Sequence, residues 1–243
     1  SAYKKGFSQL SIPDLVHANV LHNSMMFAVY LKKKHNIPFV ISSHWSALRK
    51  EARYKTSANI KYFARKIGNH AAYVLPVSDN LKNGLKYLGI NTNFGIIPNV
   101  VDTDLFHPKT SANAVFTFLH VSNLIPLKNA EKILLVSIKL LEDGSKFKIK
   151  IGGDGSSSAI KILLKIANAS KFSQEIEIFG LQTLPQIAEK MRNSDCFILF
   201  SDNENQPCVI SEAFATGLPV ISSNVGGVSE YFPKNFGILL EKS

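Results

Sequence analysis

Cysteine is scarce in this 243-residue sequence, which contains only Cys196 and Cys208. A disulfide-stabilised scaffold needs more cysteines than two, so we expect both to be free thiols in a reducing compartment, with a single disulfide between them as the alternative. Neither cysteine belongs to a CxxC or HExxH pattern of the kind that binds zinc. The sequence therefore predicts no metal site.

Long apolar runs are also absent, although 45% of the residues are hydrophobic. Because no stretch of about 18 apolar residues occurs, the sequence predicts no membrane-spanning helix. The first seven residues are polar and basic and unlike a secretion signal. No repeat of fixed period occurs, which argues against a solenoid or propeller. We expect a cytoplasmic protein with one large core or two ordinary ones.

Acidic residues are few in the first part of the chain. Residues 1–108 contain 14 Lys and Arg against 5 Asp and Glu, a net charge of +9, whereas residues 109–243 contain 14 against 13, a net charge of +1. Such asymmetry suggests a polyanionic partner, for which nucleic acid, an anionic membrane and a phosphorylated substrate are alternatives, beside a merely solvated face. Aromatic residues do not interleave with the basic ones, so we expect no nucleic acid.

Short apolar runs alternate with amphipathic stretches along the whole chain, which predicts strands alternating with helices. In the first part, strands are expected at 15–18, 38–42, 73–77 and 94–98, and helices at 24–35, 56–69 and 79–88. In the second part, strands are expected at 115–121, 147–152, 175–180, 196–200 and 218–223, and helices at 129–142, 157–170, 184–193 and 207–216. Right-handed crossovers make such an alternation a doubly wound, Rossmann-like parallel sheet.

The change in charge and a proline-bracketed stretch at 98–110 favour two domains with a boundary near residue 108. Residues 1–108 then form part of one Rossmann-like domain with four strands, incomplete at its N-terminal edge, and residues 109–243 form a second. The chain ends directly after a strand-like run, GILL. We therefore expect a fragment, truncated at both ends, of a longer protein.

The segment from 201 to 231 is richest in residues that could carry chemistry. A polar loop follows a predicted strand, and a helix is expected to begin near Asn205 with Pro207 in its first turn. The backbone N–H groups of Cys208 and Val209 would lack intrahelical partners and, with the helix dipole, would form an anion site. Ligands of open α/β sheets bind at the carboxyl ends of strands, where this loop lies.

Glu204 and Glu212 flank this expected helix N-terminus. A helix alone would hold them about 12 Å apart, but with Glu204 in the preceding loop both can approach one extended ligand. Carboxylates accept hydrogen bonds from sugar hydroxyls, so two could serve two sugar rings. Taken singly, either residue is more commonly a solvated loop or helix-N-terminal charge, but the segment as a whole favours a ligand site.

Several segments together resemble the retaining, nucleotide-sugar-dependent glycosyltransferases of family 4. Glu204 and Glu212, with Ala213, Gly217, Pro219 and Val220, are similar to the E-x7-E signature of that family. Further similar segments are HVSNLIPLKN (120–129), GGDGS (152–156), VSDNLK (77–82), IPNVVDTDLF (97–106) and ISSHWSAL (41–48). The resemblance implies the GT-B fold, in which two Rossmann-like domains face each other across a cleft.

The resemblance also implies roles for individual residues. Glu204 would contact donor-sugar hydroxyls, Glu212 would bind the ribose, and Lys128 would neutralise the leaving diphosphate. The turn of Gln206, Pro207, Cys208 and Val209 would offer backbone N–H groups to the diphosphate, Gly180 and Leu181 would lie near the base, and His44 would face the reacting sugar or acceptor. His17, Asn19 and His22, which follow a predicted strand, are weaker acceptor-side candidates.

The sequence departs from the family pattern at three places. Asn123 stands in the donor site where many members carry arginine, and Ser122 stands where the usual residue is glycine. The glycine-rich loop expected near the start of the N-terminal domain is absent. Asp102 and Asp104 have the D-x-D spacing of metal-dependent sugar transferases, but here we expect them to cap a turn.

The resulting hypothesis is a metal-independent glycosyltransferase that needs no cofactor and moves a sugar from a nucleotide diphosphate to an acceptor hydroxyl with retention. Synthesis of a cell-surface polysaccharide or glycolipid would suit it. Basic residues of the first domain could border an anionic membrane at the inner face of the plasma membrane, which fits a lipid-linked acceptor. The alternatives are a sugar-nucleotide epimerase of similar architecture and a non-catalytic basic module that binds membrane or nucleic acid.

Overall fold

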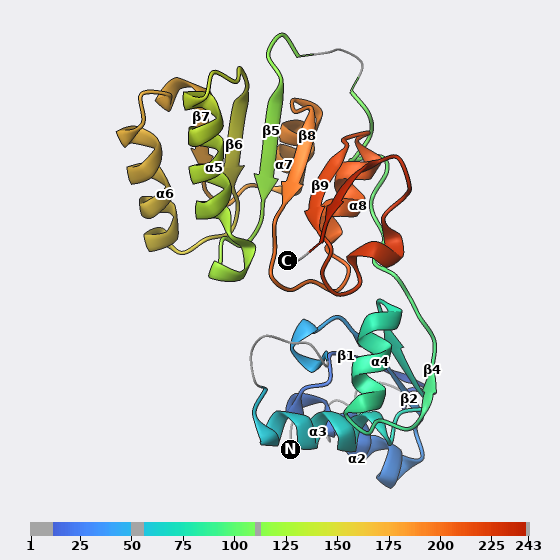
Figure 1. Ribbon diagram of the computed structural model, residues 1–243. Helices are drawn as coiled ribbons and strands as arrows, with labels where there is room; N and C mark the ends of the chain where they lie inside the picture. The colour runs from blue at the N-terminus through green and yellow to red at the C-terminus, as the bar shows by residue number, and fades with distance from the viewer. Residues whose placement is uncertain (1–11, 50–55, 110–112, 242–243) are drawn as a thin grey trace. The chain divides into compact units, whose positions relative to one another are not determined.

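The computed structural model describes residues 12–49, 56–109 and 113–241. The chain divides into two compact units, Ser1–Pro98 and Asn99–Ser243. Each unit contains a parallel sheet with helices in the connections, so the expected pair of Rossmann-like α/β sheets is confirmed (Figure 1). Within the described residues, no helix combines the length and the apolar character needed to cross a membrane.

The first unit is built on a four-stranded sheet in the order β1-β2-β3-β4. Its strands are β1 (Val16–Asn19), β2 (Phe39–Ser43), β3 (Tyr73–Pro76) and β4 (Asn93–Phe94), and its helices are η1 (Asn23–Met25), α2 (Met26–His35), η2 (Ser46–Leu48), α3 (Ala58–Gly68) and α4 (Asp79–Tyr87). The fourth strand is shorter than the expected 94–98, although Gly95 and Ile97 still donate backbone hydrogen bonds to Val74 and Pro76. Pro98 has no N–H to continue the ladder.

Serine caps and apolar spacing explain where the helices of this unit lie. The hydroxyls of Ser57 and Ser78 accept from backbone N–H groups in the first turns of α3 and α4. Asn36 ends α2 with a left-handed φ of 55°. The apolar sides of all three helices pack on one core with the strands, where Phe39 and Ile41 of β2 are fully buried.

The second unit contains a six-stranded parallel sheet in the order β10-β9-β8-β5-β6-β7. Its strands are β5 (Thr117–Val121), β6 (Lys148–Gly152), β7 (Ile176–Phe179), β8 (Cys196–Leu199), β9 (Val220–Ser223) and β10 (Gly237–Leu240). Its helices are η3 (Pro126–Lys128), α5 (Ala130–Glu142), α6 (Ser157–Ala169), η4 (Ser173–Glu175), α7 (Leu184–Arg192), α8 (Cys208–Ala215) and η5 (Val228–Tyr231).

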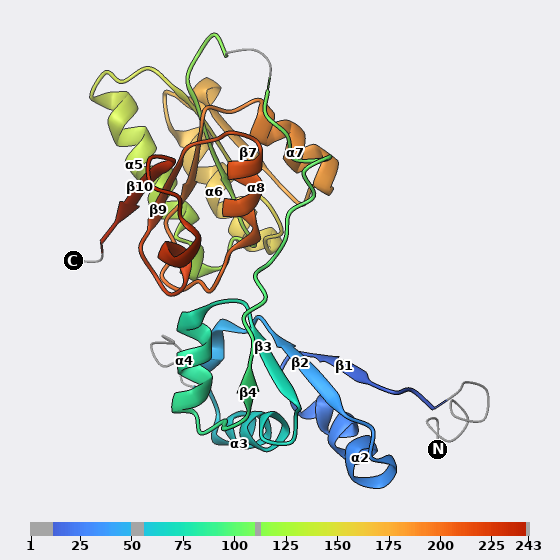
Figure 2. The same ribbon diagram turned by 90° about the vertical axis from the view of Figure 1, so that its right-hand side faces the viewer.

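Helices cover both faces of this second sheet. Buried residues of α5 and α6 share one core with β6, and buried residues of α7 and α8 share another with β8 and β9. Figure 2 shows α5 on one side of the strands and α7 and α8 on the other. Burial on both faces explains why these strands are nearly continuous apolar runs in the sequence.

The boundary between the units lies after Pro98, ten residues before the position expected near residue 108. The intervening segment packs on the second unit. Phe106 belongs to the core of that unit, and Arg192 donates a hydrogen bond to the carbonyl of Leu105 at 3.0 Å. With this boundary the charge asymmetry sharpens. Residues 1–98 contain 14 basic and 3 acidic residues, a net charge of +11, and residues 99–243 contain 14 and 15, a net charge of −1.

Candidate functional site

The strand order of the second unit creates a topological switch point between β5 and β8. From β5 the chain proceeds to β6 and β7 on one side, and from β8 it proceeds to β9 and β10 on the other. The loops that leave the carboxyl ends of β5 and β8 therefore diverge and leave a crevice, which is where open α/β sheets bind ligands. A cavity of about 330 Å³ lies there.

Residues from the ends of four strands line this cavity. Its lining comprises Val121, Ser122, Asn123 and Lys128 at or after the end of β5, Gly153 and Asp154 after β6, Leu181, Gln182 and Ile187 after β7, and Leu199, Glu204, Pro207, Cys208 and Val209 at or after the end of β8. Asn123, Lys128, Leu181, Glu204, Pro207, Cys208 and Val209 are among the residues that the sequence nominated. Gly180 lies directly before Leu181 but is not part of the lining.

Lys128 and Glu204, which both line the cavity, form an ion pair. Lys128 ends the short helix η3, and Glu204 lies in the loop between β8 and α8. Their side chains are 17% and 9% exposed, so most of both groups is removed from water. Removing one charge would leave the other largely dehydrated without this partner, which is much costlier than losing a surface pair.

Backbone contacts fix the two loops that carry this ion pair. Asn129 adopts a left-handed φ of 51°, and its side-chain amide donates to the carbonyl of Phe200 at 2.9 Å. The N–H of Asp202 donates to the carbonyl of Leu127 at 2.8 Å. Since both bonds flank the ion pair, Lys128 and Glu204 are positioned by backbone geometry rather than by their own attraction alone.

Helix α8 begins at Cys208, one residue after the start of the helix expected at 207–216 and three residues after the start expected near Asn205. Pro207 is the N-cap residue and has an extended ψ of 119°. The preceding residues are held by other contacts. Glu204 pairs with Lys128, and Gln206 bonds Asn99, whose N–H donates to Gln206 Oε1 at 2.5 Å and whose amide donates to the Gln206 carbonyl at 2.8 Å. Gln206 is thus directed to the segment after Pro98 and does not line the cavity.

The first turn of α8 presents backbone donors at the cavity. The N–H groups of Cys208 and Val209 precede the first intrahelical bond, since Ile210 is the residue that donates to the carbonyl of Pro207, at 3.1 Å. Both residues line the cavity. Their N–H groups and the positive end of the helix dipole favour an anion at this place.

Glu212 lies one turn further along α8 and is half-buried, outside the cavity lining. Burial raises the pKa of its carboxyl above the ordinary value. Burial also raises the pKa of the Cys208 thiol, with further contributions from the negative charges of Glu212 and then Glu204. Cys208 therefore experiences both carboxylates of the E-x7-E segment, one on each side.

Two residues of the site lie in segments that the sequence singled out, but the sequence assigned them no role. His120, on β5, is fully buried and bonds both the carbonyl of Ile198 and the hydroxyl of Ser122. Gly153 has a φ of +131°, and a Cβ atom there would lie 2.0 Å from the carbonyl oxygen of Ser122. A histidine inside an apolar strand is the signal for the first feature, and the GGDGS segment is the signal for the second.

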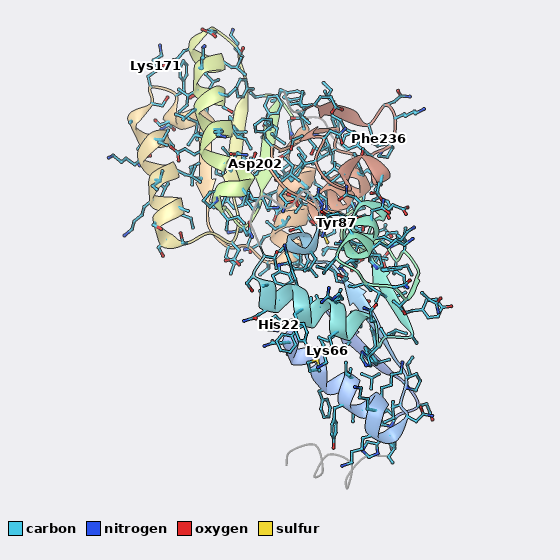
Figure 3. All side chains as sticks on the ribbon, turned by 60° about the horizontal axis from the view of Figure 1, so that its bottom comes forward. His22, Lys66, Tyr87, Lys171, Asp202 and Phe236 are labelled. Carbon is cyan, nitrogen blue, oxygen red and sulfur yellow. The ribbon has the colours of Figure 1, made fainter. Side chains whose placement is uncertain are left out.

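The acceptor-side candidates lie in the first unit. His44 directly follows β2 and is exposed. The expectation that His17 and Asn19 follow a strand is wrong, because β1 extends to Asn19 and contains both. His17 Nε2 lies 2.8 Å from Ser42 Oγ on β2. His22 follows β1 and accepts from the N–H of Ser24 as the cap of η1 (His22 is labelled in Figure 3).

The D-x-D pair serves a turn. Asp102 Oδ1 accepts from the N–H groups of Asp104 and Leu105 at 3.0 and 3.2 Å. This is the capping role that the sequence predicted for the segment. In the part of the chain that the structure describes, no group of three His, Cys, Asp or Glu residues could hold a metal ion. Both cysteines are free thiols, Cys196 buried and Cys208 exposed.

Comparison with known proteins bears on what this cavity does. The family described as glycosyl transferases group 1 matches residues 101–243, more than half of the chain. The chain belongs to the group 1 glycosyl transferases. A second family, described as glycosyltransferase family 4, matches residues 6–105. The two matches meet near the boundary between the two structural units.

Curated relatives extend over the whole chain but are longer than it. An uncharacterized glycosyltransferase of Methanocaldococcus jannaschii is 27% identical over 248 residues, covering 100% of this chain and 66% of the relative. A putative teichuronic acid biosynthesis glycosyltransferase of Bacillus subtilis is 25% identical over 245 residues, covering 99% and 61%. The chain thus spans somewhat less than two thirds of the length of these relatives.

Solved structures share the fold. Sucrose-phosphate synthase from Thermosynechococcus elongatus matches with a TM-score of 0.83 at 18% identity, over 99% of this chain and 63% of that one. HepE of Anabaena, solved in complex with UDP, matches with a TM-score of 0.80 at 20% identity, over 98% and 67%. These likenesses place the two units among the GT-B glycosyltransferases in fold.

Replacing Gly153 with alanine tests whether the GGDGS turn fixes the loop after β5. We expect Gly153→Ala to cost more stability than Gly144→Ala. Both glycines have positive φ, +131° and +95°, but a Cβ at Gly144 meets nothing within 4 Å. The control should lose about 1–2 kcal/mol from backbone strain. Gly153→Ala should lose about 1–3 kcal/mol more from the collision with Ser122. Urea unfolding measures both, and equal losses would contradict this account of the turn.

Proposed function

We propose that the second unit binds a nucleotide diphosphate-sugar, with the diphosphate between Lys128 and the first turn of α8. The observation that carries the proposal is the Lys128–Glu204 ion pair in a cavity that also receives the N–H groups of Cys208 and Val209. A cation and oriented backbone donors suit an anion, and a carboxylate beside them suits hydroxyl groups. The volume of about 330 Å³ falls in the range of small-ligand sites.

We further propose that the protein to which this chain belongs transfers the sugar to an acceptor hydroxyl with retention of configuration. The bond between the anomeric carbon and the diphosphate oxygen breaks, a bond to the acceptor oxygen forms on the same face, and the acceptor proton passes to the leaving diphosphate. Negative charge grows on the diphosphate as the bond breaks. Lys128 and the α8 N–H groups stabilise that charge without requiring a metal ion in the proposed mechanism.

Glu204 has two tasks in this proposal. Its carboxylate has about four lone-pair positions, so it can keep its bond to Lys128 while accepting hydrogen bonds from donor-sugar hydroxyls. A diphosphate oxygen beside Lys128 would share the ammonium with Glu204. Glu212, one turn further along α8, would serve the ribose, and Gly180 and Leu181 would border the base.

The comparisons support a uridine nucleotide as the first donor to test and a glycan or glycolipid as the product. HepE was solved in complexes with UDP and with UDP-glucose. The Bacillus subtilis relative is named for teichuronic acid biosynthesis. A human relative, 27% identical over 149 residues, is a phosphatidylinositol N-acetylglucosaminyltransferase subunit, so a lipid-linked acceptor is compatible with the family. In the first unit, His44 would face the acceptor, with His17, Asn19 and His22 as weaker candidates.

The first unit would bring the enzyme to an anionic membrane that holds such an acceptor. Its helices α2 and α3 contact each other and carry three exposed aromatic residues, Phe27, Tyr30 and Tyr62, which are 47%, 37% and 50% exposed. Cations accompany two of the rings, so the expectation that aromatic residues do not interleave with basic ones is wrong for these pairs. Lys34 lies 5.4 Å from the centre of the Tyr30 ring, and Lys66 lies 5.6 Å from that of Tyr62 (Lys66 is labelled in Figure 3). Amphipathic aromatic rings beside lysines suit the headgroup region of a bilayer.

Lys128→Met tests the donor site. A hydrogen bond to a charged group contributes about 1.5–3 kcal/mol, so we expect UDP-glucose to bind about 10- to 150-fold more weakly. Lys132→Met, which removes an exposed lysine of α5, is the matched control and should bind like the wild type. Isothermal titration calorimetry with UDP-, GDP- and ADP-glucose gives both values and the base preference. Equal affinity in the two variants would refute the diphosphate contact.

Glu204→Gln separates binding from sugar use. Since the carboxylate is assigned to the sugar, we expect Glu204→Gln to lower the affinity for UDP-glucose more than the affinity for UDP. Turnover with donor and acceptor should fall by about 100-fold or more, as for other losses of transition-state contacts. A loss of UDP affinity as large as that of UDP-glucose would reassign Glu204. Conversion of the donor by the wild type, without acceptor, into an epimeric sugar nucleotide would indicate an epimerase instead.

The two cysteines report where the donor lies. Cys208 is exposed at the cavity, whereas Cys196 is buried and burial raises the pKa of its thiol to about 11. Because the pKa of Cys208 is also raised, its thiolate is scarce at neutral pH and its alkylation should accelerate as the pH rises. We expect saturating UDP-glucose to slow alkylation of Cys208 by N-ethylmaleimide, measured by mass spectrometry, while Cys196 stays unreactive throughout. An unchanged rate at Cys208 would place the ligand elsewhere.

Charge reversal tests the membrane contact. We expect the chain to sediment with vesicles rich in phosphatidylglycerol at low salt, and Lys33→Glu, Lys34→Glu and Lys61→Glu together to lower the partition more than tenfold, since each lysine contributes about 1 kcal/mol near such a surface. The control reverses Lys132, Lys139 and Lys161, which are exposed on α5 and α6. Equal losses of vesicle binding in both triple variants would show that net charge alone causes the binding. Absence of vesicle binding by the wild type would refute the membrane contact.

A further inference from the structure

His120 occupies an unusual place for a titratable side chain. It is the fourth residue of β5, it is fully buried, and β5 is a central strand flanked by β6 and β8. It lines neither the cavity nor the protein surface. The proposed chemistry therefore does not use it directly, and a phenylalanine or leucine would fill the same volume without a polar group to satisfy.

The histidine ring supplies a bond where the sheet ladder ends. The ladder between β5 and β8 pairs Phe118 with Cys196 and Leu119 with Phe197. One residue beyond, His120 Nδ1 lies 2.9 Å from the carbonyl oxygen of Ile198. The pairing of β5 with β8 ends at this point, beside the switch-point crevice, and the His120 side chain bonds the Ile198 carbonyl there.

The partners of the ring determine its proton. A carbonyl oxygen only accepts, so Nδ1 carries the hydrogen. Burial, with a smaller contribution from the positive charge of Lys128, lowers the pKa of His120 to about 4 despite the bond to Ile198, so the ring is neutral at pH 7. Nε2 is then an acceptor, and the hydroxyl of Ser122, 2.9 Å away, donates to it. The Ser122 oxygen in turn accepts from the N–H of Leu124 at 3.1 Å.

These bonds form one directed chain from β8 to the loop after β5. Ser122 begins that loop, Leu124 takes a left-handed φ of 49°, and Lys128 ends it. On the other side Gly153 packs so closely that a Cβ there would collide with the Ser122 carbonyl. Ser122 therefore holds the start of the loop that carries Asn123 and Lys128, while the bonds of Leu127 and Asn129 hold its end.

We propose that His120 is a positioning residue for the donor site: its neutral Nδ1–H form links the Ile198 carbonyl to the Ser122 hydroxyl and thereby holds the loop that carries Asn123 and Lys128. The contacts of the hydrogen-bond chain stand on the geometry, and the full burial of the ring favours its neutral form. Its consequence for ligand affinity rests on the proposed function.

The first part of the test needs no ligand. In ¹⁵N-histidine spectra of the 243-residue chain at pH 7, His120 should appear as the Nδ1–H tautomer. Ser122→Ala should move the Nε2 signal toward that of an unbonded ring nitrogen and leave Nδ1–H in place. The same variant should accelerate amide exchange of Leu124 at least tenfold, and Ser122→Thr, which keeps the hydroxyl, should restore protection. An Nε2–H tautomer, an imidazolium ring, or unchanged exchange in Ser122→Ala would overturn the proposal.

The second part measures UDP affinity in a double-mutant cycle. His120→Phe fills the buried volume but lacks both bonds, and Ser122→Ala lacks the hydroxyl. Each should weaken UDP binding about five- to tenfold, and Ser122→Ala should add less than twofold in the His120→Phe background because both break the same chain. Thr117→Val is the matched control. It removes a buried hydroxyl of the same strand that bonds the Val115 carbonyl at 3.0 Å, at the opposite end from the cavity, and should bind UDP normally.

The outcomes separate the two ideas. Fully additive losses, or an equal loss in Thr117→Val, would show that His120 affects the site only through general stability and would overturn its positioning role. Absence of UDP binding by the wild type would contradict the proposed function. The tautomer and exchange measurements would still decide whether the hydrogen-bond chain exists. If His120→Phe does not fold, Ser122→Ala, Ser122→Thr and Thr117→Val carry the comparison.

Discussion

The separation of β5 and β8 at their carboxyl ends is the constraint on which the candidate site depends. Parallel strands whose connections leave in opposite directions cannot continue their ladder into the loops, so the crevice opens there. Side chains and single backbone bonds replace the ladder. The contacts between His120 and Ile198, Asn129 and Phe200, Leu127 and Asp202, and Lys128 and Glu204 all join the segment around the end of β5 to β8 or the loop after it. These four contacts therefore join the two walls of the cavity at successive positions along the chain.

Electrostatics at the site follows from how little water reaches these bridges. Lys128 and Glu204 are mostly buried, so each stabilises the charge of the other, and removing either one costs more than losing a surface pair. Glu212 and Cys208 respond to the same partial burial, which raises the pKa of both groups. In such surroundings a fixed cation and fixed N–H dipoles act on an anion more strongly than they would in water. Because these interactions are strong at short range, the position of each charged or polar group matters more than how many such groups line the site.

The sequence was sufficient for the sheets and insufficient for the loops. Apolar runs bounded by polar or turn residues predicted both sheets, because burial on two faces leaves few polar positions within a strand. The segment after Pro98 was assigned to the first domain, yet Phe106 enters the core of the second unit, which only tertiary packing reveals. The start of α8 shifted to Cys208 because Glu204 and Gln206 are held by distant partners, Lys128 and Asn99. A single histidine within β5 gave no indication that Ile198 and Ser122 would be its partners.

The departures from the family pattern acquire a physical meaning in this arrangement. The resemblance leads one to expect glycine where this chain has Ser122. The Ser122 hydroxyl donates to His120 and accepts from the N–H of Leu124, so this position is held by side-chain hydrogen bonds that a glycine could not make. Where it leads one to expect arginine, Asn123 is neutral and lines the cavity without adding charge. Among the residues that line the described cavity, Lys128 is then the sole formal cation. With one positive charge instead of two, the affinity for a diphosphate would depend strongly on the position of the Lys128 ammonium. The bonds that fix the loop carrying Lys128 would therefore contribute to that affinity.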